Sequence, residues 1–217
     1  MQKTFVMSWS GGKDSALAYY RAVLEGNVPV ALFTMFEEDG SKSRSHGLPI
    51  EILEAQAERM GLPLEIGKAG WSGYEKEFIR HLKKFKGNDI EMGVYGDIDL
   101  EDHRAWVQKV SKEADMEVSH PLWGEPRRKL LEELLAEGFK AVITVVDTTR
   151  MPAEFLGREF TLELIEELEA IGVDACGEEG EFHTVIIDGP IFVEAVPAVF
   201  GDIIEAGQYR ILEVKLQ

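Results

Sequence analysis

The chain has 217 residues, of which 45% are hydrophobic, as expected for a soluble globular protein with one sizeable core or a core domain and a small appendage. Its 40 acidic and 23 basic residues give a net charge of −17, which argues against an extended nucleic-acid surface. We interpret the tight basic cluster at residues 127–129 as a solvated helix end. The apolar runs are shorter than the ~20 residues that cross a bilayer, so we expect no membrane partner. A single cysteine, Cys176, excludes an internal disulfide and fits a cytoplasmic location.

In the first two-thirds of the chain, short apolar runs alternate with amphipathic segments. We expect strands at residues 4–8, 28–36, 63–66, 92–95, 117–119 and 141–146, and helices near 14–25, 48–60, 73–86, 100–114 and 127–137. This alternation predicts an α/β fold with a doubly wound, mostly parallel sheet over residues 1–150.

Polar and glycine residues directly follow four of these strands. A loop starting at Ser10 follows the first strand, Thr34 lies near the end of the second, Gly96 and Asp97 follow the fourth, and residues 147–150 follow the last. Because ligands of such sheets bind beyond the carboxyl ends of the strands, we expect all four ends to border one cleft.

From about residue 151 the pattern changes. One more helix is expected over residues 158–171, followed by strands at 182–187, 191–199 and 209–216. Asp188-Gly189, between the first two of these strands, is a strong hairpin signal. We therefore expect residues 151–217 to form a smaller C-terminal α+β domain, packed on the rim of the first.

The most informative segment is Ser10-Gly11-Gly12-Lys13-Asp14-Ser15, which joins the first strand to the first helix. Its glycines let backbone N–H groups approach an anion, and the helix N-terminus favours negative charge. Lys13 adds a mobile positive charge, and the serines add hydroxyl donors. The segment predicts a phosphate site. It is not a Walker A loop, because Asp14 follows the lysine, where that motif has Ser or Thr.

A second unusual segment is Gly177-Glu178-Glu179-Gly180-Glu181-Phe182-His183-Thr184, in which three carboxylates, a histidine and a threonine precede or begin a strand. Carboxylates in such a turn can orient ammonium, accept a proton from ammonia or bind Mg²⁺. His183 can hydrogen-bond a substrate carboxylate or transfer a proton. On composition alone, a solvated acidic turn is the simpler interpretation.

The loop at residues 10–15 resembles the PP-loop of ATP pyrophosphatases. Together with the segment at 177–184 and Asp188-Gly189-Pro190, it resembles the diphthine–ammonia ligase family, as do residues 95–98 and 100–104. The resemblance spans nearly the whole chain and implies an adenine nucleotide α-hydrolase-like, Rossmann-like first domain. It also implies a reaction in which ATP and ammonia amidate diphthine, a modified histidine on translation elongation factor 2. The products would be diphthamide, AMP and pyrophosphate.

For this sequence, the resemblance implies that the residues of the PP-loop bind the ATP phosphates. Glu178, Glu181 and Thr184 would line the acceptor or ammonia site. We expect catalytic roles for Lys13, Asp14, Glu178 and Glu181, with Lys13 as an electrophilic clamp on the phosphates. Asp14 is the candidate Mg²⁺ ligand, and helix capping is its alternative role.

Further contacts are expected from residues near the rim of the sheet. Thr34 and Gly96 are candidate ATP contacts, and Asp97 is a candidate for metal, ribose or substrate binding. His46, which precedes the second helix, is a substrate candidate with a capping or surface role as the alternative. Arg104 could hold a carboxylate with its forked donors.

One departure from the family pattern leaves the acceptor open. His183 lies where eukaryotic and archaeal members tend to carry Glu, as in a branch also common in bacteria, which lack diphthamide. The acceptor is therefore diphthine or another small carboxylate, for instance one of cobalamin metabolism. Free ammonia is the expected nitrogen source, because Cys176 does not resemble a glutaminase nucleophile.

Two rival classes remain. A transfer RNA thiolase with a PP-loop would need more cysteines, and a non-catalytic sensor would bind ATP without making AMP. A homodimer is one expectation for the oligomeric state.

Overall fold

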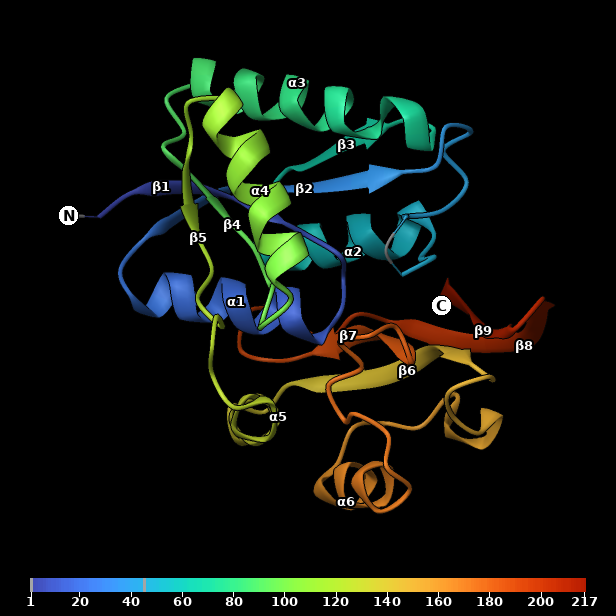
Figure 1. The fold of residues 1–217 in the computed structure, drawn as a ribbon. Coiled ribbons are helices and arrows are strands. Elements are labelled where there is room, and N and C mark those ends of the chain that lie inside the picture. The colour runs from blue at the N-terminus through green and yellow to red at the C-terminus, as the bar shows by residue number, and fades with distance from the viewer. Residues whose placement is uncertain (1, 45) are drawn as a thin grey trace.

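The structure is a computed structural model that describes residues 2–44 and 46–217. Two sheets alternate with layers of helices along one direction (Figure 1). The first sheet has the order β3-β2-β1-β4-β5, and all of its strand pairs are parallel. Its strands are Thr4–Ser8 (β1), Val28–Phe36 (β2), Leu64–Lys68 (β3), Met92–Val94 (β4) and Glu117–Ser119 (β5).

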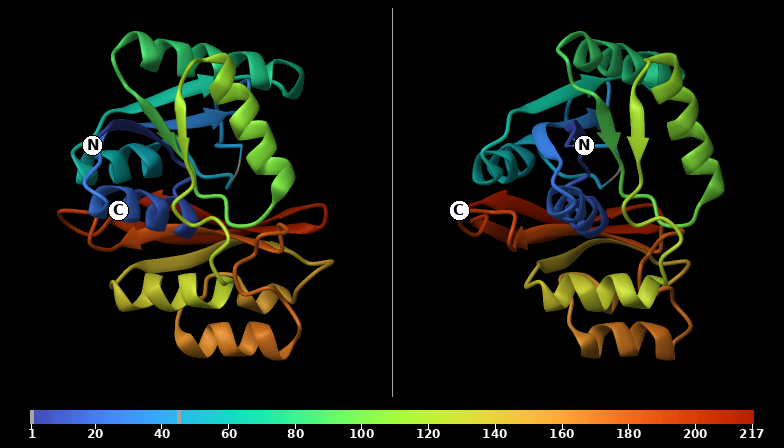
Figure 2. Two further views of the ribbon diagram at one scale, coloured as in Figure 1. Left: turned by 60° about the vertical axis from the view of Figure 1, so that its left-hand side comes forward. Right: turned by 90° about the vertical axis from the view of Figure 1, so that its left-hand side faces the viewer.

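Helices cover both faces of this sheet, which confirms the doubly wound fold. Lys13–Leu24 (α1) and Ile50–Met60 (α2) lie on one face, and Tyr74–Gly87 (α3) and Glu101–Glu113 (α4) lie on the other (Figure 2). The alternation along β1 explains both layers, because successive strand residues point to opposite faces. Phe5 belongs to the core on the α1 and α2 side, and Val6 belongs to the core on the α3 and α4 side.

The second sheet is antiparallel and has the order β7-β6-β9-β8. Its strands are Lys140–Asp147 (β6), Phe182–Asp188 (β7), Ala198–Ala206 (β8) and Tyr209–Leu216 (β9). Arg127–Ala136 (α5) and Leu162–Ala170 (α6) pack on its outer face, while α1 and α2 lie between the two sheets (Figures 1 and 2). Short 3₁₀ turns occur at Trp71–Gly73 and Ala153–Phe155.

The strand expected at residues 141–146 exists, but its expected place in the parallel sheet is wrong. β6 pairs antiparallel with β7 and β9. A short apolar run indicates a buried strand without indicating its partners, and here the partners come from later in the chain. Residues 147–150 therefore lie at the end of a strand of the second sheet, not of the parallel sheet as expected. The division of the chain at residue 150 stays a prediction.

The hairpin expected at Asp188-Gly189 is also wrong. β7 ends there, and the chain continues without a strand until Ala198, so the strand expected at residues 191–199 is largely absent. Proline has no N–H to give to a ladder, and Pro190 directly follows the glycine. The hairpin of this region joins β8 to β9 instead, with Gly207 in its turn at φ +61°.

The strand order places a topological switch point between β1 and β4, because the chain proceeds outward from β1 in both directions. Crevices beyond the carboxyl ends of the strands at such a point are the usual ligand sites of open α/β sheets. Within the described residues, no helix combines the length and apolar character needed to span a membrane.

Candidate active site

The predicted strand–loop–helix at residues 10–15 is confirmed. β1 ends at Ser8, and α1 begins at Lys13 after an extended Gly12. Gly11 has a φ of +81°, and a Cβ there would lie 2.6 Å from Leu53 Cδ2. A Cβ on Gly12 would lie 2.2 Å from Cε1 of His46. Both glycines are therefore required by close packing, Gly11 also by its left-handed backbone.

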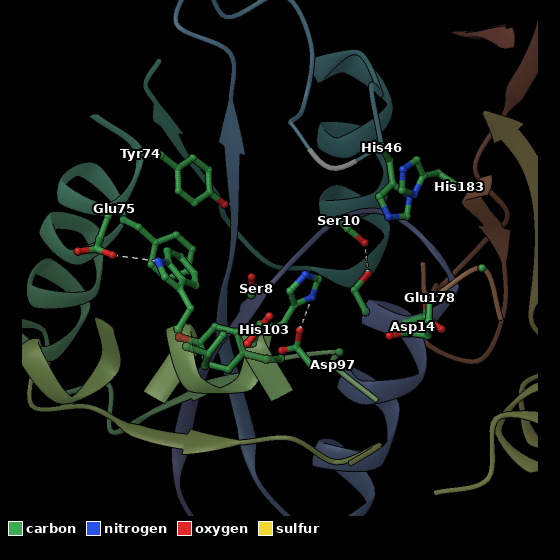
Figure 3. A pocket seen from close by; sticks show the side chains of 18 of the residues that line it. Ser8, Ser10, Asp14, His46, Tyr74, Glu75, Asp97, His103, Glu178 and His183 are labelled. Carbon is green, nitrogen blue, oxygen red and sulfur yellow. Dashed lines mark hydrogen bonds and ion pairs between the residues drawn. The ribbon is translucent and has the colours of Figure 1, made fainter. Parts of the chain in front are cut away.

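A cavity of about 700 Å³ opens beside this loop at the switch point (Figure 3). Its lining comes from distant parts of the chain. The contributing parts are the end of β1, the loop at residues 10–15 (the phosphate loop), the segment after β4, helices α3 and α4, and the turn at residues 177–181 before β7 (the acidic turn). Eight residues singled out from the sequence line it: Ser10, Asp14, Ser15, His46, Gly96, Asp97, Glu178 and His183. Gly96 must be small, because a Cβ there would lie 3.0 Å from the backbone of Asp14.

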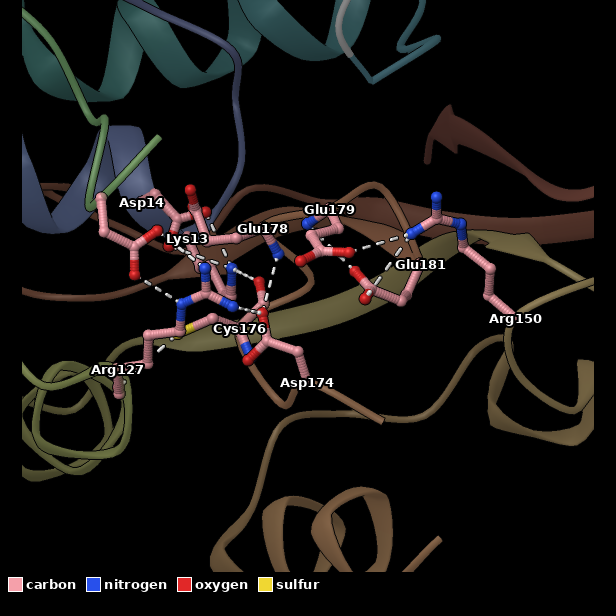
Figure 4. Close-up of polar contacts among 10 residues, drawn as sticks. Lys13, Asp14, Arg127, Arg150, Asp174, Cys176, Glu178, Glu179 and Glu181 are labelled. Carbon is pink, nitrogen blue, oxygen red and sulfur yellow. Dashed lines mark hydrogen bonds and ion pairs between the residues drawn. The ribbon is translucent and has the colours of Figure 1, made fainter. Parts of the chain in front are cut away.

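Lys13 is buried and turned toward the C-terminal segment rather than lining the cavity (Figure 4). Its ammonium donates to both carboxylate oxygens of Asp14, at 3.0 and 2.8 Å, and to the carbonyl of Cys176. Burial lowers the pKa of Lys13, but the charges and the hydrogen bond around it, chiefly those of Asp14, together outweigh burial and raise the pKa above its ordinary value. The clamp expected from this lysine would require its ammonium to leave these partners.

Glu178 faces the cavity close to Asp14 (Figures 3 and 4). Burial, reinforced by the negative charge of Asp14, raises the pKa of Glu178 to about 7. A carboxylate that is half protonated near neutral pH can both accept and return a proton.

A salt-bridge network fixes the turn that carries Glu178. Arg127 binds Asp99 through two bonds of 2.7 Å and Asp174 through one of 2.6 Å. Asp174 in turn accepts from the backbone N–H of Glu178 at 3.1 Å. Sequence reasoning treated the basic cluster as a solvated helix end and missed this role of Arg127. Its position directly after Pro126, at the start of a helix, gave no sign of it.

The rings of His46 and His183 lie against each other beside the phosphate loop, with centroids 4.7 Å apart and planes tilted by 34°. Nδ1 of His46 donates to the carbonyl of Thr184 at 2.7 Å. Burial lowers the pKa of His46 to about 4, and burial together with the neighbouring His46 lowers the pKa of His183 to about 3. Both rings are therefore neutral near pH 7, and the Thr184 contact fixes the proton of His46 on Nδ1, leaving Nε2 as an acceptor.

Asp97 lies between two further histidines at the floor of the cavity. Its carboxylate is 3.6 Å from Nδ1 of His103 and 3.3 Å from Nε2 of His120. Burial raises the pKa of Asp97, but the two histidines outweigh burial and hold it at about 2. Bonding to Asp97 correspondingly raises the pKa of His103. Asp97 is thus a fixed negative charge in the cavity.

An aromatic wall lies at the end of the cavity away from the loop, and sequence reasoning missed it. Tyr74 and Phe78 of α3 and Trp106 of α4 line the cavity, with Trp106 5.7 Å from Tyr74 and 5.0 Å from Phe78 between ring centroids. The indole of Trp106 donates to Glu75 at 3.0 Å (Figure 3). Aromatic residues at helical spacing are also typical of a hydrophobic core. The sequence therefore carried no signal that distinguishes lining a cavity from packing in the core.

Besides Gly11, Gly12 and Lys13 of the loop, four candidates lie outside the lining of the cavity. Thr34 donates its hydroxyl to the Trp9 carbonyl at 2.6 Å, and the Arg104 guanidinium lies 4.5 Å from the Trp123 ring centroid. Glu181 is buried and accepts from the backbone N–H of Glu179 at 3.1 Å. The hydroxyl of Thr184 accepts from the backbone N–H of Lys13 at 3.1 Å.

The fold and the site together define a class: an α/β protein with a phosphate-type loop at the switch point of a parallel sheet, completed by an acidic turn from a second sheet. Family models match over most of the chain, "Diphthamide synthase N-terminal domain" at residues 2–118 and "Diphthamide synthase C-terminal domain" at residues 126–209. The chain belongs to the diphthamide synthase family.

Curated relatives agree with this assignment. Proteins named diphthine–ammonia ligase match from Schizosaccharomyces pombe, at 25% identity over 95% of this chain, and from Mus musculus, at 29% identity over 86% of it. The match covers 38% of the yeast protein and 79% of the mouse protein. A solved structure described as a predicted subunit of tRNA methyltransferase from Methanocaldococcus jannaschii is 15% identical, with a TM-score of 0.47, over 86% of this chain and 98% of that one.

Proposed function

We propose that this protein is an ATP-dependent ligase that joins ammonia to a substrate carboxylate, with diphthine on translation elongation factor 2 as the acceptor. The observation that carries the proposal is the placement of Glu178 of the acidic turn in the same cavity as Ser10, Asp14 and Ser15 of the phosphate loop. The family membership and the names of the relatives support the acceptor and the use of ATP.

The proposed chemistry has two steps. An oxygen of the acceptor carboxylate attacks the α-phosphorus of ATP, the bond to the β-phosphate oxygen breaks, and pyrophosphate leaves. The nitrogen of ammonia then attacks the carbonyl carbon of the acyl-adenylate, the bond to the phosphate oxygen breaks, and AMP leaves. N–H groups and hydroxyls of the loop would stabilise charge on the departing pyrophosphate.

Glu178 is the proposed base of the second step. The attacking nitrogen must lose a proton, and a carboxylate with a pKa of about 7 is suited to take it near neutral pH. Asp14 and Asp97 add negative charge to the same cavity, which would favour an ammonium ion there.

Mg²⁺ is the proposed metal, with Asp14 as its protein ligand. Mg²⁺ is usually held by one or two carboxylates together with substrate phosphates, and Asp14 and Glu178 both line the cavity. Among the described residues, no cluster of three or more metal-binding side chains occurs. The Asp14 carboxylate in the cavity fits a metal whose other ligands are nucleotide phosphates and water. Mg²⁺ would neutralise phosphate charge when bound.

The deciding experiment uses ATP labelled at the α-phosphate, with ammonia and diphthine-bearing elongation factor 2. The proposal expects labelled AMP and one amide per AMP. Labelled ADP would contradict the adenylation scheme, and AMP formed only with another carboxylate would contradict the acceptor. A cytoplasmic location and a homodimer remain predictions, which fractionation and sedimentation would test.

A further inference from the structure

We propose that Gln56 is a positioning residue for the phosphate loop, holding the Gly11 carbonyl away from the bound phosphates. Gln56 lies on α2 and is completely buried. Its side-chain NH₂ group donates to the carbonyls of Gly11, at 3.0 Å, and of Ile186, at 2.8 Å. Its carbonyl accepts from the Trp9 indole at 2.9 Å.

These three partners determine the orientation of the amide. The indole N–H can only donate and the two backbone carbonyls can only accept, so a flipped amide would lose all three bonds. A buried polar side chain whose donors are both used must keep a single position, because each lost bond leaves a buried polar group without a partner.

The Gly11 carbonyl is held from two sides. Besides Gln56, the backbone N–H of Ile186 on β7 donates to it at 2.9 Å. The ideal Cβ position of Gly11 lies 2.9 Å from Oε1 of Gln56, so the left-handed turn itself packs against this side chain. A carbonyl that rotated toward the cavity would present its negative end to the phosphate oxygens and repel them. Gln56 therefore keeps the loop in the form that an anion requires.

Gln56 also joins the two sheets at the loop. Trp9 and Gly11 follow β1 of the first sheet, whereas Ile186 belongs to β7 of the second. An apolar side chain of equal volume would fill the space between the sheets but would support neither carbonyl. The sequence signal was a glutamine beside Leu53 and Ala57 on the inner stripe of a helix, where an apolar residue is the ordinary choice.

The test compares Gln56→Met and Gln56→Glu by calorimetric titration with ATP and, separately, with inorganic pyrophosphate. Gln56→Met keeps the volume and removes all three bonds, so we expect both affinities to fall roughly tenfold or more. In Gln56→Glu, only the protonated carboxyl can donate to a carbonyl. Its buried position favours that form, so the affinity of this variant relative to wild type should recover severalfold as the pH falls from about 8 to about 6.

A matched control separates positioning from packing. Leu168→Ala, in the core of α6 and remote from the cavity, should lower the unfolding temperature while leaving both affinities unchanged. If Gln56→Met lost stability but bound both probes like wild type, or if Gln56→Glu bound them as weakly as Gln56→Met at every pH, the inference would be overturned.

The inference depends on the proposed function only for the identity of the ligand as a nucleotide phosphate. A wild-type protein that binds ATP without releasing AMP would contradict the ligase proposal and leave this test intact. A wild-type protein that binds neither ATP nor pyrophosphate would overturn the inference as well, because there would be no anion site to maintain.

Discussion

The backbone N–H of Lys13 donates a hydrogen bond to Oγ1 of Thr184, at 3.1 Å, across 171 residues of sequence. The first residue of α1 is thereby tied to the strand that follows the acidic turn. The Cys176 carbonyl also accepts from the Lys13 ammonium, so side chain and backbone are both held by the C-terminal segment. The conformation of the phosphate loop therefore depends on contacts with both sheets, and substitutions in either sheet should affect nucleotide binding.

Substitution of Glu178 by Gln should abolish the proton transfer while keeping the shape of the turn. With wild type, we expect the rate of amide formation to rise with pH through about 7, since the carboxylate must be deprotonated to act as the base. The variant should form the amide roughly 10²- to 10⁴-fold more slowly, and its rate should not rise with pH through about 7. The profile is measured with free ammonia held constant at each pH, and an unchanged profile in the variant would exclude Glu178 as the base.

Gly12→Ala should weaken ATP binding because its Cβ collides with the ring of His46, at 2.2 Å, and approaches the Thr184 carbonyl at 3.0 Å. Backbone strain is not the cause, since φ at Gly12 is −102°. His46→Ala should partly rescue the variant by removing the ring. Gly87→Ala, in α3 with open space around its Cβ position, is the matched control and should bind ATP like wild type. Equal effects at both glycines would argue against the collision.

Arg127→Gln should move the pH profile as well as lower the stability. It removes three charge-assisted bonds from a partly exposed side chain, at a cost of about 1–2 kcal/mol in unfolding free energy. Because the positive charge of Arg127 lowers the pKa of Glu178, its loss should shift the rising limb of the rate to higher pH.

The neighbouring Arg128 provides the control for that prediction. Arg128 makes exposed pairs with Glu132 and Glu169, so Arg128→Gln should leave the free energy of unfolding nearly unchanged. Its pH profile should match that of wild type. A shift of the same size in both variants would indicate a general charge effect instead of the Arg127 network.

The stability of the protein should fall in acid through His46 and His183, which are neutral near pH 7. The folded pKa values of His46 and His183, about 4 and about 3, lie below the ordinary value of 6.5. The unfolded state therefore binds more protons, and the free energy of unfolding decreases as pH falls below about 6.5, by at most about 1.4 kcal/mol per pH unit for each histidine.

Urea titrations from pH 7 to pH 4 measure this dependence. His46→Gln should show a shallower fall than wild type. His103→Gln should show a steeper fall than wild type. Bonding to Asp97 raises the pKa of His103, so protonation of His103 stabilises the folded state in acid, and the variant loses this contribution. Parallel curves for His46→Gln and wild type would contradict the neutral assignment.

Local signals in the sequence predicted the secondary structure and the phosphate loop. The glycines of the loop, the alternating apolar runs and the amphipathic helices each depend on neighbours within a few residues, and most of these elements are confirmed, the strand expected at residues 191–199 being the exception. The acidic turn could be singled out for the same reason, although its composition also fits an ordinary solvated turn.

Partner choice between strands could not be obtained in this way. The sequence of β6 is that of one more buried strand of the first sheet. In the structure it pairs with β7 and β9, both of which lie later in the chain. The hairpin signal at Asp188-Gly189 was overridden by the following proline and by the path to β8.

The sequence by itself determined that residues 10–15 form a glycine turn between a strand and the start of a helix, since the backbone freedom of glycine is a local property. Only the tertiary structure decided that Lys13 turns toward Cys176, that Glu178 rather than Glu181 lines the cavity, and that Gln56 supports the loop. The reason is physical: burial, ion pairing and hydrogen bonding between distant segments depend on how the two sheets pack around α1 and α2, and no short stretch of sequence contains that packing.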